Sequence, residues 1–94
     1  MRGAAGVVMY RALRRALVEA RERAGLSQAE VARRLGRPQS FVSKYETGER
    51  RLDVVELIDV ARSLGAKPEQ FVATVSRVHG RRRPALTSGP RRRS

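Results

Sequence analysis

The chain has 94 residues, enough for one domain with one small core and too few for a second domain. Hydrophobic residues make up 40% and aromatic residues only 4%, so the core must be mainly aliphatic, and the lack of cysteine excludes disulfides, thiolate metal sites and thiol nucleophiles. The net charge of +12 favours a polyanionic partner, usually nucleic acid and less often an anionic membrane. Arginine-rich chains are also typical of GC-rich genomes, so the distribution of charge says more than its sum.

Residues 1–6 are predicted to form a flexible N-terminal arm. The longest apolar run near this end, from Ala4 to Tyr10, is too short to span a bilayer and lacks a signal-peptide cleavage pattern. We therefore expect no membrane partner and a soluble, cytoplasmic protein of bacterial or phage origin.

The first helix is expected from about Val8 to Ala24, because its apolar residues fall on one face: Leu13, Leu17, Ala20 and Ala24. Gly25 would end it in the left-handed conformation. Ser27 and Glu30 have the spacing of a capping box, which begins a short second helix. That helix ends at Gly36, and its inward residues are Val31, Ala32 and Leu35.

A third helix is expected from about Gln39 to Thr47, with Pro38 in its first turn and with Val42 and Tyr45 buried. A second capping-box pattern, Asp53 with Glu56, begins a fourth helix. Its expected apolar face consists of Val54, Leu57, Ile58, Ala61 and Leu64. Pro68 begins a fifth helix, whose inward residues would be Phe71, Val72, Val75 and Val78.

The tail, residues 79–94, has six arginines and no acidic residue, which predicts a disordered segment that makes nonspecific phosphate contacts. No stretch of useful length alternates apolar and polar residues with period two, the pattern of a β-strand. The predicted fold is all-α: a compact domain of five helices over residues 7–78, followed by the disordered basic tail.

The outward face of the third helix carries the strongest functional signal. With Val42 and Tyr45 inward, the side chains that point away are Gln39, Ser40, Ser43 and Lys44. A merely solvated face in this arginine-rich chain would more often carry Arg and Glu. Gln pairs with adenine and Lys with guanine in the major groove, so the face is a candidate for reading bases. An ordinary exposed face remains the alternative.

Four short motifs follow one another at spacings that are typical of a known protein family: Leu26-Ser27-Gln28, Leu35-Gly36, Val42-Ser43-x-x-Glu46-x-Gly48 and Ala61-x-x-Leu64-Gly65. The chain therefore resembles the lambda-repressor-like (Cro/repressor, Xre-type) helix-turn-helix proteins, over about residues 13–75. The resemblance implies that the third helix enters the major groove of double-stranded DNA, with Gln39 and Ser40 as the leading base readers and Ser43 and Lys44 next.

The same resemblance implies phosphate contacts from Gln28, at the start of the second helix, and from Thr47, Arg50 and Arg51, in or after the third. It also implies a buried pair between Arg21 and Glu46. Two departures stand out: Arg37 occupies a usually apolar position and is predicted to loosen the turn or to add a phosphate contact, and Leu52 occupies a position that is often Pro. Solvated loop charges are the alternative reading of Arg50 and Arg51.

The fifth helix carries more apolar residues than one small core needs, so some are expected at a dimer interface. Val72 and Val78 are the expected exposed edge, and Phe71 and Val75 align along the inward stripe. The predicted interface set is Val72, Val75 and Val78, with core packing as the alternative. One recognition helix covers only a few base pairs, so we expect a homodimer on DNA.

Nothing in the sequence supports catalysis, a metal site or a cofactor, since paired carboxylates, a phosphate loop and a ligand set are all missing. The predicted function is a sequence-specific transcriptional regulator, a repressor acting on a two-fold operator. An alternative is an antitoxin that binds a toxin partner and regulates its own promoter. A third reading is a bridging module that contacts the transcription machinery.

Overall fold

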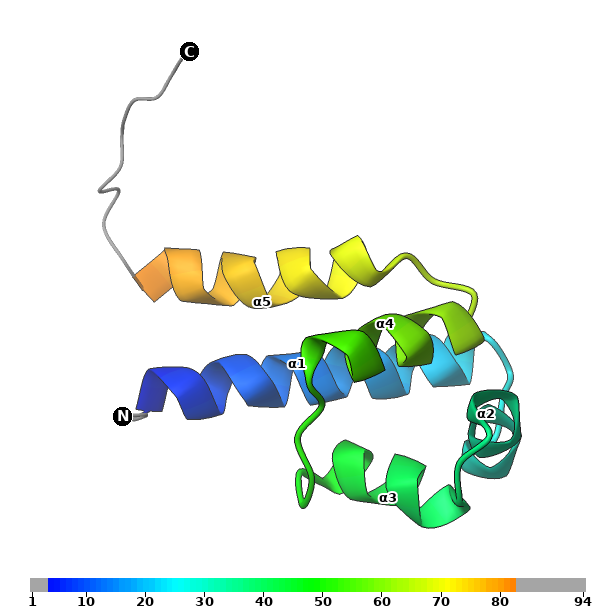
Figure 1. Ribbon diagram of the computed structural model, residues 1–94. Coiled ribbons are helices and arrows are strands. Elements are labelled where there is room, and N and C mark those ends of the chain that lie inside the picture. Colours follow the sequence, from blue (N-terminus) through cyan, green and yellow to red (C-terminus); the bar gives the residue numbers. More distant parts are fainter. Residues whose placement is uncertain (1–3, 83–94) are drawn as a thin grey trace.

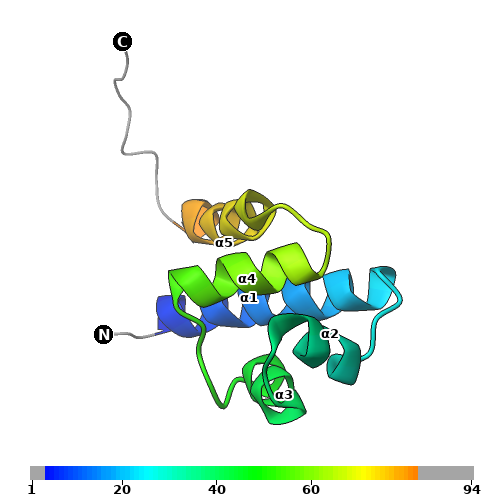
Figure 2. The same ribbon diagram turned by 45° about the vertical axis from the view of Figure 1, so that its right-hand side comes forward.

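The structure is a computed structural model that describes residues 4–82, and within them the chain forms five helices and no strand. Helices α1 (Ala4–Arg23) and α5 (Pro68–Arg82) lie side by side and run in opposite directions (Figure 1). Helices α2 (Gln28–Leu35) and α3 (Gln39–Thr47) pack against one another at one end of α1, and α4 (Val54–Ser63) lies between α3 and α5 (Figure 2). The predicted all-α, five-helix fold is confirmed.

Both predicted capping boxes are present. The Ser27 hydroxyl accepts a hydrogen bond from the Glu30 N–H, and the Glu30 carboxylate accepts one from the Ser27 N–H. Asp53 and Glu56 make the same reciprocal pair at the start of α4. These bonds satisfy backbone donors that have no partner within the helix, so they fix where α2 and α4 begin.

The core is aliphatic, as the composition predicts, with three aromatic rings within it. Its centre is formed by fully buried side chains from four helices: Leu17, Val31, Val42, Tyr45 and Val60. Phe41 is also buried, and its ring meets that of Tyr45 edge-on at 5.5 Å between centroids. The two short helices α2 and α3 are therefore held by burial against α1 and α4, because neither is long enough to be stable alone.

The first and last helices extend a few residues beyond the predicted limits of the domain. The predicted arm covered residues 1–6, but α1 already begins at Ala4, because alanines are strong helix formers and the helix continues alongside α5. The domain was expected to end at residue 78, but α5 continues to Arg82. Residues 83–94, most of the predicted tail, lie outside the described residues.

The expected apolar face of α4 also needs correction. Val54 is 73% exposed, whereas Val60, which was not expected inward, is fully buried. The buried stripe is Leu57, Val60, Ala61 and Leu64, which follows the helical i, i+3, i+4, i+7 pattern. Val54 is the first residue after the cap, so it projects beyond the edge of the core. Ala24, expected on the inward face of α1, is exposed because the helix ends at Arg23.

Candidate nucleic-acid interface

The turn between α2 and α3 sets the orientation of the third helix. Gly36 takes the left-handed conformation (φ 69°), which ends α2 and lets the Arg37 N–H donate to the Ala32 carbonyl at 3.0 Å. Pro38 was expected in the first turn of α3 and instead immediately precedes it, in an extended conformation. The chain thus turns within three residues, 36–38, and the first two residues of α3, Gln39 and Ser40, are exposed.

The four residues predicted to read bases share the outer face of α3. Gln39, Ser40 and Lys44 are exposed and Ser43 is half-buried, whereas the opposite face is buried: Phe41, Val42 and Tyr45. The Ser43 hydroxyl donates to the Ser40 carbonyl at 3.3 Å, so its oxygen stays beside the helix surface. The face is polar, and Lys44 gives it a single positive charge.

A chain of hydrogen bonds runs from the surface of α3 to α1. The Gln39 amide donates to Oε1 of Gln28 at 3.4 Å, and Nε2 of Gln28 donates to Oε1 of Glu46 at 2.8 Å. Glu46 in turn accepts from Nε and Nη2 of Arg21 at 2.7 and 3.1 Å. The first base-reading candidate is therefore oriented by a network that crosses α2 and ends on an ion pair.

The ion pair implied by the resemblance is confirmed. Arg21 and Glu46 expose only 15% and 6% of their side chains. The hydrogen bond to Glu46 raises the pKa of Arg21, against the opposing effect of its burial. The Arg21 Nη1 group also donates to the Leu26 carbonyl at 2.9 Å, so the same guanidinium holds the loop that leads into α2.

Of the five residues predicted to contact phosphate, Gln28 is half-buried in the network described above, and the other four fall into two environments. Thr47 and Arg51 are exposed, and the Arg51 guanidinium lies over the Tyr10 ring at 4.7 Å. Arg37 and Arg50 instead both bind the carboxylate of Glu56 and both lie over the ring of Phe41. The sequence indicated Glu56 only as a helix cap, and it gave no expectation for Phe41.

Arg14 is a further residue that the sequence analysis missed. Its Nη1 group donates to the Glu46 carbonyl at 3.4 Å, and its Nε atom is buried without a hydrogen-bond partner. The guanidinium lies so close to Gly48, where φ is 91°, that a Cβ there would be 2.9 Å from its Cζ atom. Arg14 and Arg21 are seven residues apart and therefore on one face of α1, which is the pattern that could have indicated a shared partner.

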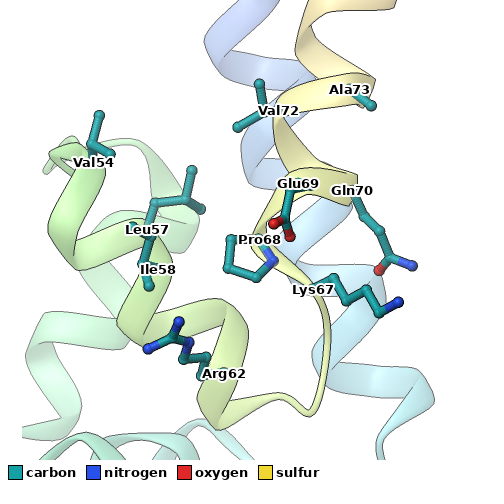
Figure 3. Close-up of a pocket in the computed structure, with 10 residues that line it drawn as sticks. All are labelled: Val54, Leu57, Ile58, Arg62, Lys67, Pro68, Glu69, Gln70, Val72 and Ala73. Atoms are coloured by element: carbon teal, nitrogen blue, oxygen red, sulfur yellow. The ribbon is translucent and has the colours of Figure 1, made fainter.

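The predicted dimer-interface residues differ in exposure. Val72 is 57% exposed, as expected, whereas Val75 is half-buried against the core and Val78 is half-buried rather than exposed. Val72 lines an apolar groove of about 930 Å³ between α4 and α5, together with Val54, Leu57 and Ile58 (Figure 3). The exposed apolar surface of α5 is therefore centred on Val72 and continues onto α4.

Within residues 4–82, no three side chains of His, Cys, Asp or Glu are grouped closely enough to hold a metal ion. None of the helices described is long and apolar enough to cross a membrane.

Comparison with known proteins places this geometry in a family. The model of a helix-turn-helix domain family matches residues 11–73. A solved structure, described as an XRE-family like protein from Pseudomonas syringae pv. tomato str. DC3000, is similar with 50% sequence identity and a TM-score of 0.72. The match covers 74% of this chain and 85% of that protein. No curated protein gives a significant match.

Proposed function

The chain belongs to the Cro/Xre-type helix-turn-helix family of DNA-binding transcription regulators, and from that premise we propose that it is a repressor that recognises one DNA sequence through α3. The observation that carries the proposal is the outer face of α3. Its four polar side chains are presented together, and the buried face behind them fixes the helix. Such a helix fits the major groove of double-stranded DNA, where each base pair presents a distinct hydrogen-bonding pattern.

In the proposed complex, Gln39 pairs with the edge of an adenine and Lys44 with a guanine, and Ser40 and Ser43 accept or donate to neighbouring bases. The network through Gln28 supports this role for Gln39, because a side chain held before binding loses less conformational entropy on binding. Thr47 and Arg51, and Gln28 at the start of α2, would contact phosphates on either side of the groove. Arg37 and Arg50 are also proposed to contact phosphates, although the carboxylate of Glu56 compensates part of their positive charge.

We further propose that two copies bind a two-fold operator through the apolar surface around Val72. One recognition helix reads too few base pairs to single out a site in a genome. The groove supports the proposal because most of its exposed lining is apolar, at Val54, Ile58 and Val72, and its burial would be favourable. Arg62, Lys67 and Glu69 also line the groove (Figure 3). An interface confined to this surface would be small, so we expect pairing mainly on DNA.

The test is the selection of bound duplexes from a random DNA pool at ~150 mM salt, followed by the same selection with Gln39→Ala. The variant should lose about 1–3 kcal/mol of affinity for the selected site and relax the preference at one base position. Thr74→Ala is the control, because Thr74 is a polar residue of α5 that lies away from the recognition helix and does not line the α4–α5 groove. Recovery of no consensus by the parent chain, or an unchanged consensus with Gln39→Ala, would contradict the proposal.

A further inference from the structure

One carboxylate, that of Glu56, accepts four hydrogen bonds on the side of the domain that carries the turn before α3 and the loop after it. Its Oε1 atom accepts from Nη1 of Arg50 at 2.9 Å and from the Asp53 N–H at 3.0 Å. Its Oε2 atom accepts from Nη2 of Arg50 at 2.8 Å and from Nη2 of Arg37 at 3.3 Å. The capping residue of α4 is thus also the counter-ion of two arginines.

These two arginines flank the recognition helix. Arg37 lies in the turn before α3 and Arg50 in the loop after it, and both guanidinium groups stack on Phe41 of α3, with Cζ 4.2 and 4.9 Å from the ring centroid. Their side chains are 42% and 40% exposed, whereas that of Glu56 is only 14% exposed. Both arginines are therefore fixed on the protein by a carboxylate and a ring, yet they still face solvent near the proposed phosphate contacts.

The charge of Glu56 persists under ordinary conditions. The bond from Arg50, with further bonds from the Asp53 backbone and Arg37, lowers the pKa of Glu56 to about 2. The carboxylate therefore stays ionised at neutral pH and offsets one of the two guanidinium charges. Nonspecific affinity for DNA depends on how many cations are free to replace counterions on the phosphates, so a fixed internal counter-ion lowers that affinity.

We propose that Glu56 is a positioning residue that restrains Arg37 and Arg50 and thereby limits nonspecific binding to the DNA backbone, which raises the ratio of specific to nonspecific affinity. The proposal rests on the DNA-binding function proposed above. It assigns to the α4 cap a role in discrimination, in addition to its role in stability.

The test compares Glu56→Gln with Glu30→Gln on a duplex that lacks the selected site, over a range of salt concentrations. Both substitutions remove one negative charge at the third position of a capping box. Glu30, however, accepts from the Ser27 N–H at 2.7 Å and pairs with no guanidinium among the side chains of residues 6–78, which the structure describes. Between 50 and 200 mM salt, Glu56→Gln should make the loss of nonspecific affinity larger by about 3.5-fold if one arginine is freed, and by about 12-fold if both are. Glu30→Gln should change it less.

A second comparison separates the freed arginines from any change in folding. Arg50→Gln should lower the salt dependence more in the Glu56→Gln background than in the parent background, whereas a merely structural effect of Glu56→Gln would make the two decreases equal. In the parent background, Arg50→Gln should reduce the salt dependence less than Arg51→Gln does, because only Arg50 already has a carboxylate partner. This last pair leaves Glu56 intact, so it remains informative even if the Glu56 variant folds poorly.

Equal salt dependences for Glu56→Gln and Glu30→Gln, or an Arg50→Gln effect as large as that of Arg51→Gln, would overturn the inference. If the parent chain fails to select any duplex, the proposed function fails first. The two failures are therefore distinguishable, because the failure of the proposed function is detected with the parent protein alone, whereas the failure of this inference is detected only by comparing variants.

Discussion

Arg21 in α1 and Glu46 in α3 form a two-point ion pair, with Nε 2.7 Å from Oε2 and Nη2 3.1 Å from Oε1. The pair connects the longest helix to the recognition helix across the interior of the domain. Because Glu46 also accepts from Gln28, which in turn accepts from Gln39, it supports the fold and the orientation of the base-reading face at once.

Glu46→Ala should lower the free energy of unfolding by about 3 kcal/mol, because it leaves the Arg21 guanidinium largely buried without its counter-ion. Thermal denaturation measures the loss. Glu49→Ala is the control, since Glu49 is exposed in the following loop and should change stability little. Small and equal effects of the two substitutions would show that the pair contributes nothing to stability.

Stability in acid should depend on Glu56. Its folded-state pKa of about 2 is below the ordinary 4.5, so its ionised form stabilises the fold. That contribution is complete above the ordinary pKa and is lost as the pH falls through the folded-state value. The difference in melting temperature between the parent and Glu56→Gln should therefore shrink between about pH 5 and about pH 3. A constant difference over this range would contradict the assignment.

Tyr10→Phe should destabilise the protein by about 1–3 kcal/mol, because the Tyr10 hydroxyl accepts the Leu52 N–H at 2.6 Å and its loss leaves a half-buried backbone donor unsatisfied. The ring that packs against Arg51 is retained, so the substitution reports the hydroxyl alone. Chemical denaturation gives the free energy. A variant as stable as the parent would show that water replaces the phenol at no cost.

Val72→Lys should abolish the cooperative appearance of a two-protein complex on a palindromic site while binding to a half-site survives, because a lysine there places a charge in the apolar surface. Band-shift titration measures both. Val55→Lys is the control, because Val55 is 68% exposed but does not line the groove. Cooperative loading by the Val72 variant would place the dimer contact elsewhere or indicate a monomer.

Much of the fold could be predicted because its signals are local. The two capping boxes, the glycines that end the helices and the apolar periodicity of α1 to α3 each depend on residues within one or two turns. Errors occurred where tertiary context decides. Val54 follows the helical pattern of α4 but lies beyond the edge of the core, and the ends of α1 and α5 extend because the two helices pack against each other.

The sequence by itself determined the five helices, the family and the polar outer face of α3, since these follow from residue type and spacing along the chain. Only the tertiary structure decided which acidic side chain pairs with which arginines. Glu56 is separated by 19 residues from Arg37 and by six from Arg50, and no periodicity relates three positions on a turn, a loop and a helix. They meet beside Phe41 because the packing of α2 against both α3 and α4 brings the start of α4 near the two ends of α3. Side-chain ion pairs form wherever folding brings opposite charges within reach, whatever their separation in sequence.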